Sequence, residues 1–187
     1  MYNKERLDGL SEDYFTEMTP LERTMAFDFL LKRVKTGGSE ESVHGLFQAN
    51  SDRAIAVIND LLSNDVLDGE GLIAAAWNLY RTQKDENLLS IFVRFMSSPH
   101  KALREKAAYY VPADNLTDEL KSGLQGMIHT ETEQLARIHA VDKLLECYGV
   151  NEESVGRAKY LNIYRGLHGE DLRTKESIFR QLDALTT

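Results

Sequence analysis

The sequence has few of the residues that cross-link a chain or interrupt its helices. Only one of its 187 residues, Cys147, is a cysteine, so no disulfide can form within the chain. Only three are prolines, which leaves long stretches free to be helical. The longest uncharged stretches, such as residues 71–80, are about half the length of a membrane-spanning helix, and the first ten residues lack an apolar signal segment. These absences predict a cytoplasmic protein in a reducing compartment.

Basic charge is also scarce, and the shortage is concentrated in the first third of the chain. The formal net charge is -8, of which residues 1–70 carry -7 and residues 71–187 carry -1. A surface of this sign repels the phosphates of nucleic acids and attracts basic partners. The alternative is an acidic surface that serves only to keep the protein in solution.

Helical periodicity is present along almost the whole chain. Apolar residues recur at i, i+3, i+4 and i+7 in residues 27–34 and 160–167, and at four-residue steps in residues 116–128. No sustained alternation of apolar and polar residues suggests a strand. The breaks between helices are short, so neighbouring helices should pack antiparallel. These patterns predict an all-α fold.

Each proline has a predicted place at a helix end. Residues 19–22 read Thr-Pro-Leu-Glu, a capping box with proline at the first helical position. Ser98-Pro99 is expected to start a second helix, and Pro112 to end the helix before it.

A nine-residue pattern occurs twice, 33 residues apart, as LREKAAYYV from Leu103 and ARIHAVDKL from Ala136. Apolar residues hold the first, fifth and ninth places and arginine the second. The helix 31 residues before Leu103 matches the apolar places only, and the helix 36 residues after Ala136 matches only at its start. Each such helix follows another amphipathic helix, so the repeated unit is a helix pair that must stack on the next to bury its apolar face. Gly123 and Gly126, inside one first helix, predict a close helix crossing.

This pattern resembles HEAT-type repeats, which are antiparallel helix pairs with an apolar-Arg-x-x-Ala signature on the second helix. It is clearest at residues 103–107 and 136–140 and extends over residues 51–185. An Asp shortly before the Arg often links neighbouring units in that family. The comparable places here hold Ser98 and Glu131, which leaves the polar ladder between units open.

The resemblance implies a right-handed α–α superhelix (a HEAT-like solenoid) of about four helix pairs. The whole chain, residues 1–187, is then one domain, in which helices of residues 1–50 cap the pairs of residues 51–187. The alternative is a helical bundle without repeats that matches the pattern twice by chance.

Residues capable of catalysis are present, but their positions have structural explanations. Four adjacent acid pairs could do general acid/base work, yet each lies at a predicted helix start, where carboxylates are stabilised by the helix dipole. No two of the five histidines have a metal-binding spacing, and Cys147 has no activating neighbour. We therefore expect no enzymatic activity, no metal site and no cofactor. The acid pairs are Asp85-Glu86, Asp118-Glu119, Glu152-Glu153 and Glu170-Asp171.

Aromatic and arginine side chains recur on the second helices, which line the inner surface of a solenoid. Trp, Tyr and Arg are the residues that most often dominate protein interfaces, although they could equally fill gaps between helix pairs. Together with acids of the first third they form the predicted partner-binding set. Its members are Glu40, Glu41, Asp60, Asp65, Trp77, Tyr80, Arg81, Arg104, Tyr109, Tyr110 and Arg137.

The function that these features favour is that of a non-catalytic module that binds a basic protein through an acidic concave surface. Small acidic proteins with this profile are similar to bacterial immunity proteins or antitoxins, which bind and neutralise a toxin domain, often a nuclease. An alternative is a nucleic-acid-binding HEAT-like protein that uses a local basic patch of Lys101, Arg104, Lys106, Arg137 and Lys143. A small helical scaffold, chaperone or enzyme with a pocket between its helices is the third. No membrane partner is expected.

Overall fold

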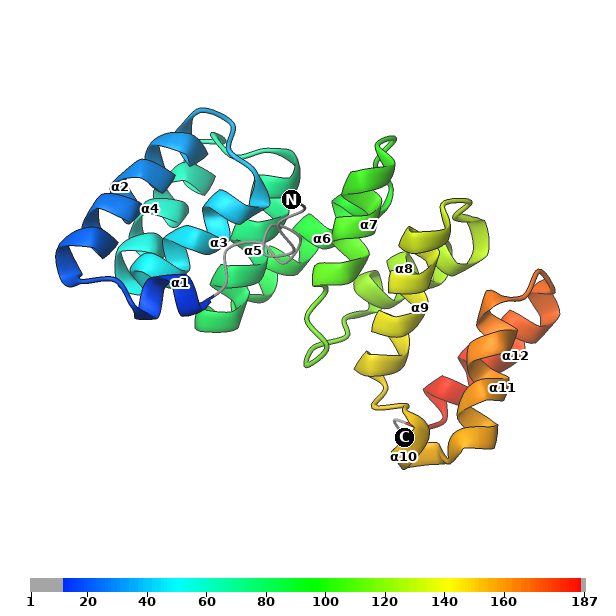
Figure 1. Ribbon diagram of the computed structural model, residues 1–187. Helices are drawn as coiled ribbons and strands as arrows, with labels where there is room; N and C mark the ends of the chain where they lie inside the picture. The colour runs from blue at the N-terminus through cyan, green and yellow to red at the C-terminus, as the bar shows by residue number, and fades with distance from the viewer. Residues whose placement is uncertain (1–11, 186–187) are drawn as a thin grey trace, which may run out of the picture. The chain divides into compact units, whose positions relative to one another are not determined.

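The computed structural model describes residues 12–185, and all the regular structure in this range is helical (Figure 1). The contacts divide the chain into a first unit, Met1–Asp85, and a second unit, Glu86–Thr187. The single domain expected over the whole chain stays a prediction beside this division.

The helices of the first unit are α1 (Glu12–Thr16), α2 (Pro20–Lys35), α3 (Glu40–Ala49), α4 (Ser51–Ser63) and α5 (Gly69–Gln83). Those of the second are the short 3-10 helix η2 (Glu86–Leu88), α6 (Leu89–Met96), α7 (Lys101–Tyr110), α8 (Asp118–Thr130), α9 (Gln134–Cys147), α10 (Glu152–Val155), α11 (Arg157–His168) and α12 (Leu172–Asp183).

Local sequence explains where several helices begin and end. The predicted capping box is confirmed, because the Thr19 hydroxyl accepts from the Glu22 N–H while the Glu22 carboxylate accepts from the Thr19 N–H. Helix α7 ends two residues before Pro112, as predicted. The helix start expected at Ser98-Pro99 is wrong by two residues. The Ser98 hydroxyl accepts from the His100 N–H in the turn, and α7 begins after it.

The first unit consists of two helix pairs that follow α1. Helices α2 and α3 pack together, and α3 also packs along α5. Helix α2 meets α4 through Arg53, which binds Asp28 at 3.0 Å and covers the ring of Phe27. Helices α2 and α3, expected to cap the repeats, thus contact α4 and α5 directly, and their role as a cap stays a prediction.

The second unit begins with two stacked pairs. The two helices contact each other within the pair α6–α7 and within the pair α8–α9. Between the pairs, the first helices α6 and α8 are in contact, and so are the second helices α7 and α9. The first, fifth and ninth places of the sequence pattern face the core as predicted. In α9 all three are buried. Of the other three, Ala107 in α7 and Val111 just after it are buried, while Leu103 is half-buried.

The third pair of this unit, α11 and α12, is arranged differently. Helix α11 packs against α9, a second helix, whereas polar side-chain contacts join α12 to α8, a first helix. Lys175 Nζ donates to the Ile128 carbonyl at 2.7 Å, and Lys121 Nζ lies 2.7 Å from the Asp183 carboxylate. The short helix α10 and Gly156, at φ +82°, intervene before α11. The pair therefore packs in the reversed order, in the part of the chain where the sequence pattern fades.

Candidate functional site

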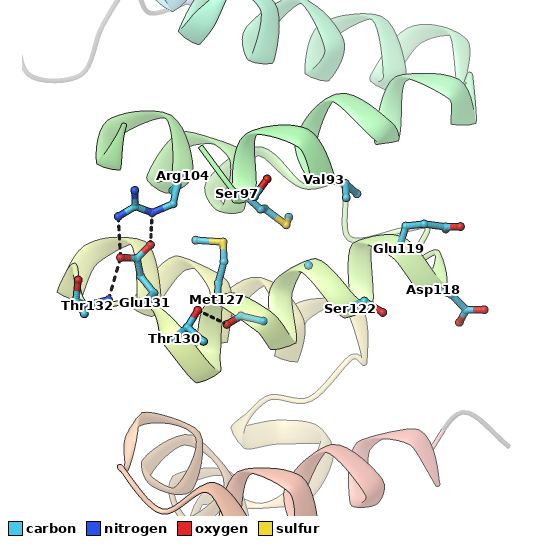
Figure 2. Close-up of a pocket in the computed structure, with 13 residues that line it drawn as sticks. Val93, Ser97, Arg104, Asp118, Glu119, Ser122, Met127, Thr130, Glu131 and Thr132 are labelled. Atoms are coloured by element: carbon cyan, nitrogen blue, oxygen red, sulfur yellow. Dashed lines mark hydrogen bonds and ion pairs between the residues drawn. The ribbon is translucent and has the colours of Figure 1, made fainter. Parts of the chain in front are cut away.

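An open groove of about 870 Å³ runs between α6 and α8 in the second unit (Figure 2). Its floor is apolar, since Val93, Met96 and Met127 line it. Helix α8 forms one wall along its whole length, which is about 20 Å for 13 residues. A groove of this size and composition can accept apolar side chains of a peptide segment, and its methionines can adapt to their shapes.

The two glycines of α8 shape this groove in different ways. A Cβ atom on Gly123 would lie 2.6 Å from the Met96 sulfur, so this glycine permits the close contact with α6 that the sequence predicts. A Cβ atom on Gly126 would have no atom within 4 Å. The close crossing expected at Gly126 is therefore wrong, because this glycine faces the open groove. Its missing side chain deepens the groove at a cost of roughly 0.5–1 kcal/mol in helix stability.

The two ends of the groove differ in charge, as Figure 2 shows. At one end the exposed carboxylates of Asp118 and Glu119 form the first turn of α8. At the other end Arg104 binds Glu131, so the charges there are neutralised. The open carboxylates leave the groove with a net negative end that suits a lysine or arginine of a ligand.

The Arg104–Glu131 pair links two helix pairs. Arg104 Nε and Nη2 donate to the two Glu131 carboxylate oxygens at 2.5 and 3.0 Å, and Nη1 donates to the carbonyls of Ser98 and Pro99. Glu131 also accepts from the N–H groups of Thr132 and Glu133. The bond from Arg104, aided by these N–H groups, holds the pKa of the Glu131 carboxyl below its ordinary value. Within the second unit, Glu131 thus provides a polar link between the pair α6–α7 and the pair α8–α9.

The acidic residues predicted to bind a partner gather at one end of the first unit. Glu40 and Glu41 open α3, and Asp65 lies in the loop after α4. A Cβ atom on Gly71 would lie 3.1 Å from the Gly38 carbonyl, so the loop before α3 touches the start of α5. Of the four predicted acids, Glu41, Asp60 and Asp65 are exposed, while Glu40 is half-buried.

The aromatic residues predicted on α5 are largely covered. Tyr80 is only 2% exposed and offers almost no surface to a partner. Trp77 is half-buried, with the His44 ring edge-on at 5.3 Å and the Arg81 guanidinium 4.5 Å over its own ring. Arg81 itself is exposed. On this helix the gap-filling interpretation fits Tyr80, and Arg81 remains the residue that a partner could reach.

The residues of α7 and α9 that were predicted to bind a partner differ in their surroundings: the arginines bind carboxylates of the protein, whereas Tyr109 is exposed. Tyr109 is 53% exposed and packs edge-on against Tyr110 and His139. Arg104 and Arg137 are half-buried, and each binds a carboxylate next to the following second helix, Glu131 or Glu170. The two arginines therefore have structural partners, and Tyr109 is the exposed member of the set.

The basic patch that would favour nucleic acid is largely neutralised within the protein. Carboxylates lie within salt-bridge distance of Lys101, Arg104, Arg137 and Lys143, and such pairing weakens attraction for phosphate. The pairs are Lys101–Glu133 at 3.5 Å, Arg104–Glu131 at 2.5 Å, Arg137–Glu170 at 3.4 Å and Lys143–Glu146 at 2.6 Å.

No group of three or more His, Cys, Asp or Glu side chains within residues 12–185 is arranged to hold a metal ion. Cys147 lies at the end of α9 beside the Pro112 carbonyl, and burial raises the pKa of its thiol to about 11. A thiol of this kind is mostly protonated at neutral pH, which suits a packing residue and not a nucleophile.

The reactivity of Cys147 should reflect this environment. The shift of its pKa from 9.0 to about 11 lowers the thiolate fraction about 100-fold, and the greater nucleophilicity of a more basic thiolate restores about tenfold. We expect the native protein to react with Ellman's reagent at pH 8 about ten times more slowly than the same chain in denaturing urea. A native rate equal to the unfolded one would show that this environment does not protect the thiol.

The sequence did not reveal the groove, although it contained the signals. The acid pair Asp118-Glu119 was explained by the helix start, and Gly126 by a helix crossing. One further sign of the groove is that α8 has two glycines three residues apart. A single close crossing with α6 requires only one of them, Gly123. The predicted aromatic and arginine residues lie on second helices, whereas the groove lies between the first helices α6 and α8 and has Arg104 of the predicted set at one end.

Of the helices that the structure describes, none has the length and apolar character to span a bilayer. Comparisons of the chain with protein-family models, with curated proteins and with solved structures gave no match.

Proposed function

We propose that this protein is a non-catalytic binding module, and that the groove between α6 and α8 holds a segment of a basic partner protein. The observation that carries the proposal is the open space over Gly126, in a groove with an apolar floor and an acidic end. The segment would place an apolar side chain over Gly126 and a lysine or arginine near Asp118 and Glu119. Burial of one large apolar side chain contributes about 1.5–3 kcal/mol, which is the scale of an interface hot spot.

The acidic end of the first unit supports a basic partner as well. Charges such as Glu41 and Asp65 accelerate the encounter with a positively charged protein without touching it in the final complex. A nuclease domain is basic because its substrate is anionic. Neutralisation of such a toxin, as by an immunity protein or antitoxin, is the role that this charge favours within the proposal.

The proposed architecture behind this role is a HEAT-like stack. What supports it is the packing of α6 on α8 and of α7 on α9, together with the polar link between Arg104 and Glu131. The reversed order of α11 and α12 limits this proposal, within the second unit, to the first two pairs.

The proposal is tested by filling the groove. Peptides of about a dozen residues are selected by display against the whole protein and then measured on Gly126→Phe and on the matched control Gly126→Ala. Both variants remove the helix cost of glycine and should fold at least as well as the wild type. We expect Gly126→Phe to weaken peptide binding about 100-fold, because its ring occupies the groove, and Gly126→Ala to change it less than about threefold.

The selected sequences themselves provide the second measurement. Each should combine an apolar residue with lysine or arginine, and Asp118→Lys should weaken their binding most at low salt. Peptides without basic residues, or peptides that bind Gly126→Phe as tightly as the wild type, would contradict the proposed role of the groove.

A further inference from the structure

Helix α2 of the first unit carries an exposed apolar stripe that the groove does not use. Leu21, Met25 and Phe29 are 70%, 64% and 60% exposed. They are spaced four residues apart, so they lie along one face of the helix. Single exposed apolar residues are ordinary, but three large ones in a row on one helix mark an interaction surface.

The opposite face of α2 already supplies the core. Phe27, Leu30 and Val34 are buried against the rest of the first unit. The helix is therefore apolar on two sides, although only one is covered within the first unit. A stripe that contributes nothing to the core of its own unit needs a different reason to be apolar.

The charges beside the stripe complement those of an identical helix. Glu22 lies near the start of α2, and Lys32 and Arg33 lie in its last turns. Positions 22 and 33 are eleven residues, or about three turns, apart and therefore lie on the same side of the helix. The Arg33 guanidinium is 5.9 Å from the Phe29 ring, which holds it next to the stripe.

We propose that a second copy of this chain docks on this stripe, with the two α2 helices antiparallel and the two-fold axis between Met25 and Phe29. In this arrangement Met25 packs on the partner's Phe29. Glu22 then faces the partner's Arg33 on the same flank of the interface, and the reciprocal pair forms by symmetry. The proposal is independent of the groove in the second unit.

Such a contact is small and its affinity should be modest. Three side chains cover less than the roughly 800 Å² per partner of a standard interface. We expect sedimentation velocity of the full chain to show a monomer–dimer equilibrium between tens and hundreds of micromolar. Met25→Glu should raise the dimer dissociation constant on the order of 100-fold, because it places a charge in the apolar contact. The residue is exposed and glutamate is a good helix former, so this variant should fold like the wild type.

Two charge reversals test the antiparallel arrangement. Glu22→Lys and Arg33→Glu should each dimerise poorly alone, because each creates two like-charge pairs. An equimolar mixture of the two should restore a dimer, since every lysine or arginine then faces a glutamate. A wild type that remains monomeric at hundreds of micromolar would overturn the proposal. So would a dimer that Met25→Glu leaves unchanged, or a mixture that associates no better than its components.

Discussion

Replacement of Arg104 by leucine is expected to lower the free energy of unfolding by about 3 kcal/mol. The side chain of Glu131 is only 3% exposed and that of Arg104 is 19% exposed, so solvent screens this pair weakly. The variant leaves the Glu131 carboxylate buried without its cation, and it also removes the donors that satisfy the carbonyls of Ser98 and Pro99. Two turns, one before α7 and one before α9, would lose their common tie. Urea denaturation at pH 7 measures the effect.

The matched control for this prediction is the double variant Arg104→Leu with Glu131→Gln. It removes the uncompensated charge, and the amide oxygen of Gln can still accept from the N–H groups of Thr132 and Glu133. We expect it to recover about half of the lost stability. A single variant that costs less than about 1 kcal/mol would show that the link does not hold the helix pairs together.

The same pair predicts how stability depends on pH. Because the pKa of Glu131 is lower in the folded protein than its ordinary 4.5, the folded state holds the proton less tightly than the unfolded state. The stabilisation is therefore present above pH 4.5 and is lost as the pH falls through the folded-state pKa. In Arg104→Leu this part of the acid dependence should be much smaller, since the main cause of the lowered pKa is gone.

The local pattern of the sequence was sufficient for the helical class and for the buried faces of α7 and α9. The apolar places of α7 and α9 and the capping box at Thr19 depend only on residues close in the chain, so they could be found without a structure. The link from Arg104 to Glu131 could not, because it joins residues 27 apart and requires the packing of two pairs. The resemblance to HEAT-type repeats left this link open, because geometry decides which carboxylate an arginine reaches.

The groove between α6 and α8 and the reversed order of α11 and α12 also depend on contacts between residues far apart in the sequence. Gly123 and Gly126 look alike in sequence, yet one touches Met96 and the other faces open space. The difference arises from which face of α8 packs on α6, and the repeated glycines alone do not tell the two faces apart. Lys175 illustrates the same limit, because a lysine on an amphipathic helix is expected to face solvent.

Lys175 is buried instead, with 2% of its surface exposed, and it gives the second large prediction. Its ammonium group donates to the Ile128 carbonyl near the end of α8, where that carbonyl has no continuing helix to bond. Lys175→Ala removes this donor and leaves a cavity between α12 and α8. The expected loss is about 3 kcal/mol in the free energy of unfolding, measured by urea denaturation.

Lys175→Met separates the two contributions, since it fills the space but cannot donate a hydrogen bond. We expect it to cost about 1 kcal/mol or less, because burial lowers the pKa of Lys175 and removal of the charge relieves that desolvation. The lowered pKa means that the unfolded chain binds this proton more tightly than the folded one. Wild-type stability relative to Lys175→Met should therefore rise as the pH approaches 10.5, the ordinary pKa of lysine. A methionine variant as unstable as the alanine variant would show that the hydrogen bond to Ile128, and not the packing, joins α12 to α8.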